Sequence, residues 1–289
     1  MKMLNKIAVV VCGWHYPSHF YQALAKQALP EGWEMHLFVV GHRDPIHSHN
    51  EKNLILNSKN LLDILDCILY KTPVTVEFLN NLGWMYIEGE SGCEWQAANT
   101  WLDNIDYTEY DCILIAGDDA LILNDRLIYD AVTNQINLLD NFKEHDRWKS
   151  KPASDTNWLV ISNSRQPRQL SIRGSFEFFK PEVISYIGGK FDLSKITLSR
   201  KGEVTTPSDY NALTDWNKYI SSFIHKMAEL NLYDKIKYMS DHYRVSDYVI
   251  ECERGLLSNA NTLAPDYISK IEKLYNDGKF DNILNEYNS

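Results

Sequence analysis

Residues 110–123 read YDCILIAGDDALIL, an apolar run that ends in two adjacent carboxylates and then resumes. The part CILIA, residues 112–116, has the continuous apolar and β-branched character of a strand that is covered on both faces. Burying an unpaired carboxylate is costly, so proteins pair it, neutralise it or give it a metal ion. Asp118 and Asp119 therefore either form a turn or hold a cation.

Similar apolar runs lie upstream and alternate with helical patterns. Strands are predicted at Ile7–Cys12, at Met35–Val40 and within residues 83–89. Ser18 can cap the first helix, and Ser91 with Glu94 forms a capping box for the last one. Helices are predicted over residues 18–29, 61–70, 74–82 and 91–105.

The second half of the chain has a different pattern. Strands are predicted in NWLVISN and QLSIRGSFEFF, followed by a helix that begins at Pro181. Further helices are predicted over residues 210–232 and from Pro265 to the end. The whole order predicts an α/β fold, with a mixed, mainly parallel sheet, helices on both faces and a helical C-terminal part. We expect residues 1–150 and 151–289 to form two halves of one continuous domain.

Polar or glycine residues follow three of the predicted strands. They are Gly13, Gly41 and the Asp118–Asp119 pair. In sheets of this type, ligands bind outside the carboxyl ends of the strands. The loops after these strands are therefore expected to converge on one site.

The composition is that of an ordinary globular protein, with 289 residues, 44% hydrophobic and 24% charged. No apolar run approaches the roughly 20 residues that span a bilayer. The N-terminal KIAVVVCG is typical of a first core strand rather than a cleaved signal, so we expect a cytoplasmic protein. The five cysteines are scattered without a C-x-x-C pair, which favours reduced structural thiols over zinc or disulfides.

The net charge of −10 argues against nucleic acid as a partner, because a nucleic-acid groove needs a basic surface. A phosphate-bearing ligand would need a local cation or a helix N-terminus to offset the repulsion. Asp118 and Asp119 fit this need, since hard carboxylate oxygens suit Mg²⁺ or Mn²⁺ together with substrate phosphates. The alternative is a turn, in which Asp bonds its own backbone. We favour the cation.

The acidic pair and three further stretches, one before it and two after it, resemble GT-A-type (family 2-like) glycosyltransferases, which use nucleotide sugars and carry an Asp-x-Asp or Asp-Asp-Asp motif at a strand end. The likeness covers about residues 5–220. In this chain the motif is Gly117-Asp118-Asp119, so its first carboxylate is absent. The other stretches are EGESGCEWQAANTWLD, RGSFEFFKPEVISYIGGKFD and TPSDYNALTDW, in the family's order.

The resemblance implies a nucleoside-diphosphate sugar, such as a UDP-sugar, as donor and a glycan, protein or lipid-linked acceptor. It implies Mn²⁺ or Mg²⁺ on Asp118, Asp119 and His242, with Asp119 as the main ligand. Asp209 is the implied catalytic base, with Asp215 as the substitute, and Trp216 the implied acceptor contact. The implied nucleotide-binding residues are Gly13, His15, Asp44, Glu90, Asn99 and Asp118.

Simpler interpretations stay open for several of these residues. Asp209 can cap a helix, and His242 can be structural, with Arg244 nearby able to meet phosphate. His47 and His49 are typical of a solvated loop. Most tryptophans are expected in the core.

Two other functions also stay open. A nucleotidyltransferase uses a related sheet, but the loop CGWHYPSHF has one glycine and neither lysine nor arginine to hold a triphosphate. A non-catalytic nucleotide- or glycan-binding relative is the second alternative, because the first aspartate of the motif is absent.

Overall fold

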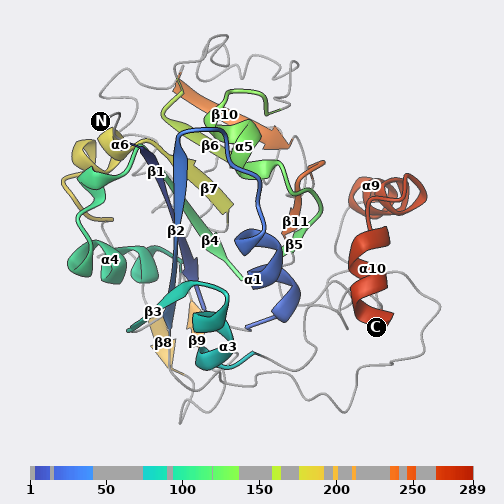
Figure 1. Cartoon of the computed structure of the whole chain (residues 1–289), viewed down its shortest axis with the longest axis horizontal. Coiled ribbons are helices and arrows are strands. Elements are labelled where there is room, and N and C mark those ends of the chain that lie inside the picture. The colour runs from blue at the N-terminus through green and yellow to red at the C-terminus, as the bar shows by residue number, and fades with distance from the viewer. Residues whose placement is uncertain are drawn as a thin grey trace.

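The computed structural model describes an α/β protein built around one mixed sheet (Figure 1). The described residues are 4–13, 16–41, 74–89, 94–118, 120–136, 158–163, 176–191, 198–200, 210–212, 235–240, 246–251 and 265–288.

The main sheet has seven strands, and six of them run parallel. They are β1 (Asn5–Cys12), β2 (Trp33–Gly41), β3 (Trp84–Glu88), β4 (Cys112–Gly117), β6 (Val160–Asn163), β7 (Phe176–Phe179) and β10 (Ile236–Ser240). Their order across the sheet is β10-β6-β7-β4-β1-β2-β3, and β7 alone is antiparallel to its neighbours. The predicted mixed, mainly parallel sheet is thus confirmed, and strands from both halves of the chain belong to it.

The central strands are covered on both faces, as their continuous apolar sequences indicate. Every residue of β4 and residues 7–12 of β1 are buried. Helices α1 (Ser18–Ala25), α3 (Val76–Asn81) and α5 (Leu127–Val132) contribute to the core on one face. On the other face are α4 (Glu94–Asn104) and α6 (Pro181–Tyr186), which lie left of the sheet in Figure 1 while α1 lies to its right.

The predicted helix over 91–105 is confirmed within the described residues. Trp95 and Ala98 of α4 are buried against the sheet, and Leu102 and Ile105 are partly buried there. Pro181 is the first residue of α6, where its missing N–H has no intrahelical acceptor to lose. Residues 61–70 and Ser91 lie outside the described part of the chain.

Two local predictions are wrong. Ser18 is the first residue of α1 rather than its cap, because Pro17 occupies the cap position, and α1 ends at Ala25 instead of residue 29. The expected helix over 210–232 begins instead as a strand, β9 (Tyr210–Ala212). It pairs with β8 (Leu198–Arg200), and these inter-strand bonds override a local helical pattern. Residues 213–232 lie outside the described part.

The chain after the acidic pair forms β5 (Ala120–Ile122), which pairs antiparallel with β11 (Val249–Glu251) in a separate two-stranded sheet. All three residues of β5 are buried. This explains why the apolar run resumes after the acidic pair: Asp118 follows a strand of the main sheet, and a strand of a second sheet begins at Ala120.

The C-terminal part is helical, as predicted, with α9 (Pro265–Asn276) and α10 (Asp281–Asn288) separated by a short turn. Among the described residues, no helix has the length and apolar character needed to cross a membrane.

Candidate functional site

The carboxyl ends of four neighbouring strands meet at one edge of the sheet. Cys12 of β1 pairs with Gly117 of β4 and with Val40 of β2, and Gly41 pairs with Glu88 of β3. The residues that follow these strands are therefore brought to the same level. The predicted convergence of the loops after β1, β2 and β4 is confirmed for their first residues.

Asp118 follows the central strand β4 and is almost completely buried, with 1% of its surface exposed. Its Oδ2 accepts the backbone N–H of Tyr16 at 2.8 Å and the hydroxyl of Tyr21 at 3.1 Å. These donors are 102 and 97 residues away in the sequence. The described bonds therefore tie Asp118 to the β1–α1 connection and to α1.

Tyr16 is fixed through both of its backbone polar groups. Its N–H donates to Asp118, and its carbonyl accepts the N–H of Val74 at 2.9 Å. Its φ is +54°, in the left-handed region that residues with a β-carbon rarely adopt. Surrounding interactions hold this conformation in place.

The ring of Tyr16 packs on Gly13, which follows β1, and on Gly41, which ends β2. A β-carbon on Gly13 would lie 2.7 Å from the Tyr16 Oη and 2.9 Å from Val39 Cγ2, and one on Gly41 would also collide with the Tyr16 Oη. Tyr16 is hydrogen-bonded to the Tyr86 hydroxyl, which itself donates to the Gly41 carbonyl. Gly13, which is predicted to approach a nucleotide, must therefore be glycine for packing within the fold as well.

Tyr16 and Tyr21, the buried tyrosines bonded to Asp118, stay protonated at ordinary pH. Burial raises the pKa of Tyr21 well above its usual value, and the nearby Asp118 raises it further. Burial, then the neighbouring Tyr86 and Asp118, raise the pKa of Tyr16 in the same direction. Tyr21 is therefore a permanent hydrogen-bond donor to Asp118, which suits an ionised carboxylate that can only accept.

The segment after the acidic pair is also bound to α1. The N–H of Ile122 in β5 donates to Nε2 of His19 at 3.3 Å. Asp118 and Ile122 thus both bond to α1 residues, one on each side of Asp119. The β4–β5 junction is held against the first helix on both sides.

Asn99 lies on α4, and its amide is bonded to one peptide segment. Nδ2 donates to the Phe191 carbonyl and Oδ1 accepts the Phe191 N–H, each at 2.9 Å. These bonds join α4 to the segment after α6. The nucleotide-binding role implied for Asn99 stays a prediction, and the described role of the side chain is structural.

A second buried carboxylate, which sequence reasoning missed, lies within the sheet. Glu177 of β7 is fully buried, and its Oε1 accepts the Ser162 hydroxyl at 3.3 Å. It pairs with Ile115, which packs on the α4 face of the sheet, opposite the face that holds Tyr21. Its signal in the sequence is the single acid inside the aromatic run FEFF.

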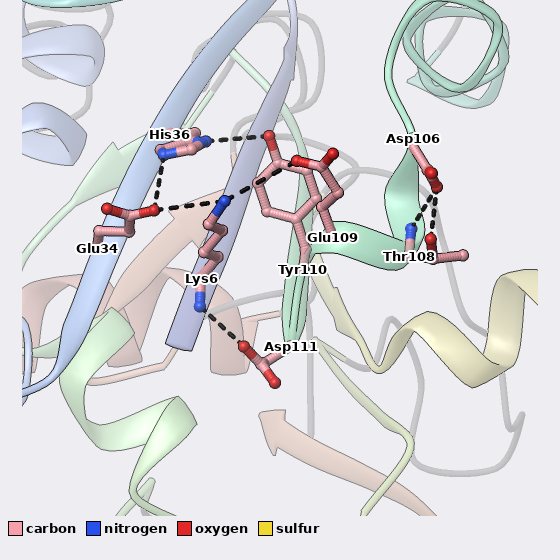
Figure 2. Close-up of polar contacts among 8 residues, drawn as sticks. All are labelled: Lys6, Glu34, His36, Asp106, Thr108, Glu109, Tyr110 and Asp111. Carbon is pink, nitrogen blue, oxygen red and sulfur yellow. Dashed lines mark hydrogen bonds and ion pairs between the residues drawn. The ribbon is translucent and has the colours of Figure 1, made fainter. Parts of the chain in front are cut away.

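A contrasting polar network lies at the amino ends of β1 and β2 (Figure 2). His36 Nδ1 lies 3.1 Å from the Tyr110 hydroxyl, and His36 Nε2 lies 3.3 Å from Glu34 Oε1. Figure 2 shows the Lys6 ammonium between Glu34 and Glu109, at 3.6 and 3.9 Å. The charged side chains here are 31–63% exposed. Exposed pairs of this kind stabilise a fold by only about 0–1 kcal/mol.

Most of the predicted site residues lie outside the described part of the chain. They are His15, Asp44, Glu90, Asp119, Asp209, Asp215, Trp216, His242 and Arg244, together with His47 and His49. Among the residues that are described, no group of three or more His, Cys, Asp or Glu side chains could hold a metal ion. One predicted ligand, Asp118, is described, and one of its oxygens already accepts two hydrogen bonds. The cation role of Asp119 stays a prediction.

Sequence reasoning missed Tyr16, Tyr21 and Tyr86. A signal was present for Tyr21, because a tyrosine beside the apolar stripe of a helix needs a partner for its hydroxyl once buried. No local pattern marks Tyr16 or Tyr86, whose positions depend on packing between separate strands.

No protein-family model matches this chain, and no curated protein sequence matches it. Among solved structures, the chain is similar to TarS from S. aureus, with 15% identity and a TM-score of 0.41 over 87% of this chain. It is also similar to the mannosyltransferase PcManGT from Pyrobaculum calidifontis, determined with GDP-Man and Mn²⁺, with 14% identity and a TM-score of 0.35 over 81% of this chain.

A third similar structure is the 4-diphosphocytidyl-2C-methyl-D-erythritolsynthase from Anaerococcus prevotii, with 9% identity and a TM-score of 0.38, covering 90% of this chain and 99% of that one. The chain spans 37% of TarS and 56% of PcManGT. Glycosyltransferases are thus among the structures that this chain is similar to, as the sequence resemblance implies.

Proposed function

We propose that this protein is a metal-dependent glycosyltransferase that moves a sugar from a nucleoside-diphosphate donor to an acceptor hydroxyl. The observation that carries the proposal is the position of the acidic pair. Asp118 is buried at the carboxyl end of the central strand, bonded to the connection that follows β1. In α/β sheets this edge is where ligands bind.

The charge of the chain favours a cation beside such a donor. A protein with a net charge of −10 repels a diphosphate unless positive charge is supplied locally. Asp119, which follows Asp118 in the sequence, would hold Mn²⁺ or Mg²⁺ here, with His242 as a further ligand. When bound, the cation would offset the charge of the diphosphate and of the leaving nucleotide.

The acceptor is proposed to enter from the side of the second half of the chain. Asp209 would take the proton from the acceptor hydroxyl, if the reaction inverts the anomeric carbon, and Trp216 would contact the acceptor. His15, Asp44 and Glu90 would contact the nucleoside, near Gly13. These assignments rest on the sequence resemblance, and each can be tested by substitution.

The first experiment is calorimetric titration of UDP and of GDP, with Mn²⁺ and with EDTA, into the wild type and Asp119→Ala. Mn²⁺ is expected to strengthen nucleotide binding by the wild type, and Asp119→Ala is expected to remove that gain. Asp125→Ala is the matched control, because Asp125 is exposed, lies close in sequence and loses the same charge. Two results would contradict the proposal. One is nucleotide binding that neither Mn²⁺ nor Asp119→Ala changes, and the other is a wild type that binds no nucleotide.

Turnover separates the proposed function from its alternatives. A glycosyltransferase releases UDP or GDP from a nucleotide sugar when a suitable acceptor is present, and Asp209→Asn lowers that release. A nucleotidyltransferase instead releases pyrophosphate from a nucleoside triphosphate and a sugar phosphate. The absence of lysine and arginine from residues 7–25 argues against that second reaction. Binding without any release would indicate a non-catalytic relative.

A further inference from the structure

Asp118 uses one of its carboxylate oxygens to bind protein donors. Oδ2 of Asp118 is bonded to the Tyr16 N–H and the Tyr21 hydroxyl, and the side chain is 1% exposed. A cation ligand needs its oxygens directed at the ion. Oδ2 of Asp118 is instead directed at two protein donors inside the fold and acts on those donors.

Of the two hydrogen-bond donors to Asp118, the backbone N–H of Tyr16 matters more for ligand binding, because Tyr16 lies closer to the proposed site. This residue follows β1 at the edge where the strand ends converge, and its φ of +54° is unfavourable without support. The Gly13 N–H bonds to the Val40 carbonyl at 2.9 Å, so the chain is anchored on β2 just after β1. Asp118 supplies the corresponding anchor at Tyr16.

The anchor is itself held rigidly. Tyr21 lies on α1, is fully buried, and packs edge-to-face on Trp84 with ring centroids 5.1 Å apart. The indole N–H of Trp84 donates to the Tyr21 carbonyl at 3.3 Å. Asp118 thus connects the central strand, the first helix and the end of the β1 connection through a single oxygen.

We infer that Asp118 is a positioning residue for nucleoside binding, which acts by holding the Tyr16 backbone and does so without a cation. The inference rests on the proposed function, since it assumes that a nucleotide binds beside β1. It assigns different tasks to the two acids: Asp119 serves the diphosphate through the metal ion, whereas Asp118 keeps the nucleoside side of the site in its binding conformation. The two tasks differ in their dependence on metal.

The test is titration of UDP and of GDP into Asp118→Asn and Asp119→Ala, each with Mn²⁺ and with EDTA. Asp118→Asn keeps the shape and one acceptor oxygen but removes the charge that strengthens both bonds. The expected result is a weakening of nucleotide binding by about fivefold or more in both conditions, because affinity falls with the fraction of molecules in the competent conformation. Asp119→Ala is expected to weaken binding only when Mn²⁺ is present.

Asp111→Asn is the matched control. Asp111 lies just before β4, and its Oδ2 accepts the Lys6 N–H of β1 at 2.9 Å, so it makes the same kind of bond at the opposite end of the same two strands. Its substitution is expected to leave both affinities unchanged. Titrations are made well below each variant's melting temperature, so that a loss of stability alone does not change them.

Tyr21→Phe is the second variant, for the case that Asp118→Asn does not fold. It removes one donor to Asp118 and keeps the buried ring, and it is expected to weaken binding with and without Mn²⁺ by a smaller factor. If the wild type binds and the Asp118 and Tyr21 variants lose only the Mn²⁺-dependent part, or nothing, the inference is overturned while the proposed function stands. A wild type that binds neither nucleotide overturns both.

Discussion

At both ends of the neighbouring strands β1 and β4, an aspartate carboxylate accepts a backbone N–H, but one of these bonds is exposed and the other is buried. At the amino end, Asp111 accepts the Lys6 N–H at 2.9 Å among exposed charges (Figure 2). At the carboxyl end, Asp118 accepts the Tyr16 N–H at 2.8 Å inside the fold. Water can replace the first bond but has little access to the second, so the energetic weight lies at the carboxyl end. The geometry of a bond therefore says little until its burial is known.

The largest expected difference between the ends is in stability. Asp118→Ala leaves the Tyr16 N–H and the Tyr21 hydroxyl without this acceptor, and should lower the free energy of unfolding by about 2–5 kcal/mol. Asp111→Ala should cost about 1 kcal/mol or less, because solvent satisfies the Lys6 N–H. Urea unfolding at neutral pH measures both. Equal losses would contradict the comparison.

The second largest expected loss of stability comes from substituting Gly41, which packs against Tyr16 at the carboxyl end. Gly41→Ala places a β-carbon against the Tyr16 hydroxyl and 2.9 Å from the Gly13 carbonyl. Such overpacking should cost about 1–3 kcal/mol. Combining it with Tyr16→Phe should recover at least about 0.5 kcal/mol relative to the sum of the single variants. Additive losses would show that Tyr16 does not set the size limit at Gly41.

Alkaline pH should lower the free energy of unfolding through the buried Tyr21. The pKa of Tyr21 is raised in the folded protein, so the stability that this tyrosine contributes is fully present below about pH 10 and is lost as pH rises toward the folded pKa. Above about pH 10 the unfolded chain loses the Tyr21 proton and the folded chain does not. Tyr21→Phe should therefore make the fall in unfolding free energy shallower by about 1.4 kcal/mol per pH unit.

Urea unfolding between pH 9 and pH 11 measures this slope. Tyr186→Phe, at a side chain that is 42% exposed, controls for the loss of a hydroxyl. A slope that is the same in Tyr21→Phe and in the wild type would mean that Tyr21 ionises as readily in the folded as in the unfolded chain.

The smallest effect belongs to the amino-end network. Glu34→Gln removes the carboxylate that lies near both Lys6 and His36. It should change the free energy of unfolding by less than about 1 kcal/mol, and 1 M NaCl should remove most of that change. Thermal or urea unfolding at low and high salt provides the measurement. A larger loss that persists in high salt would indicate that this end carries more of the stability than its exposure suggests.

Much of the sheet was predictable because its signals are local. The apolar runs of β1, β2 and β4 identify strands covered on both faces, and their alternation with helices identifies a mainly parallel sheet. Parallel strands place their carboxyl ends together, so the neighbouring positions of Gly13, Gly41 and Asp118 followed from the same pattern.

Errors arose where distant segments override local preference. Tyr210–Ala212 lies in a helical pattern but pairs with β8, and such pairing depends on chain brought from elsewhere. Tyr16 was not singled out, because no neighbour in sequence marks it. Its surroundings come from Gly13, which follows β1, from Gly41 of β2 and from Tyr86 of β3.

The sequence by itself determined that two carboxylates end the central strand at the ligand-binding edge of an α/β sheet, because hydrophobic periodicity and strand order are written in consecutive residues. Only the tertiary structure decided that Asp118 is buried and bonded to Tyr16 and Tyr21. Those donors lie 102 and 97 residues away and reach Asp118 only when α1 packs on the sheet. A hydrogen bond of this kind depends on distance and direction in space, which residue spacing does not contain.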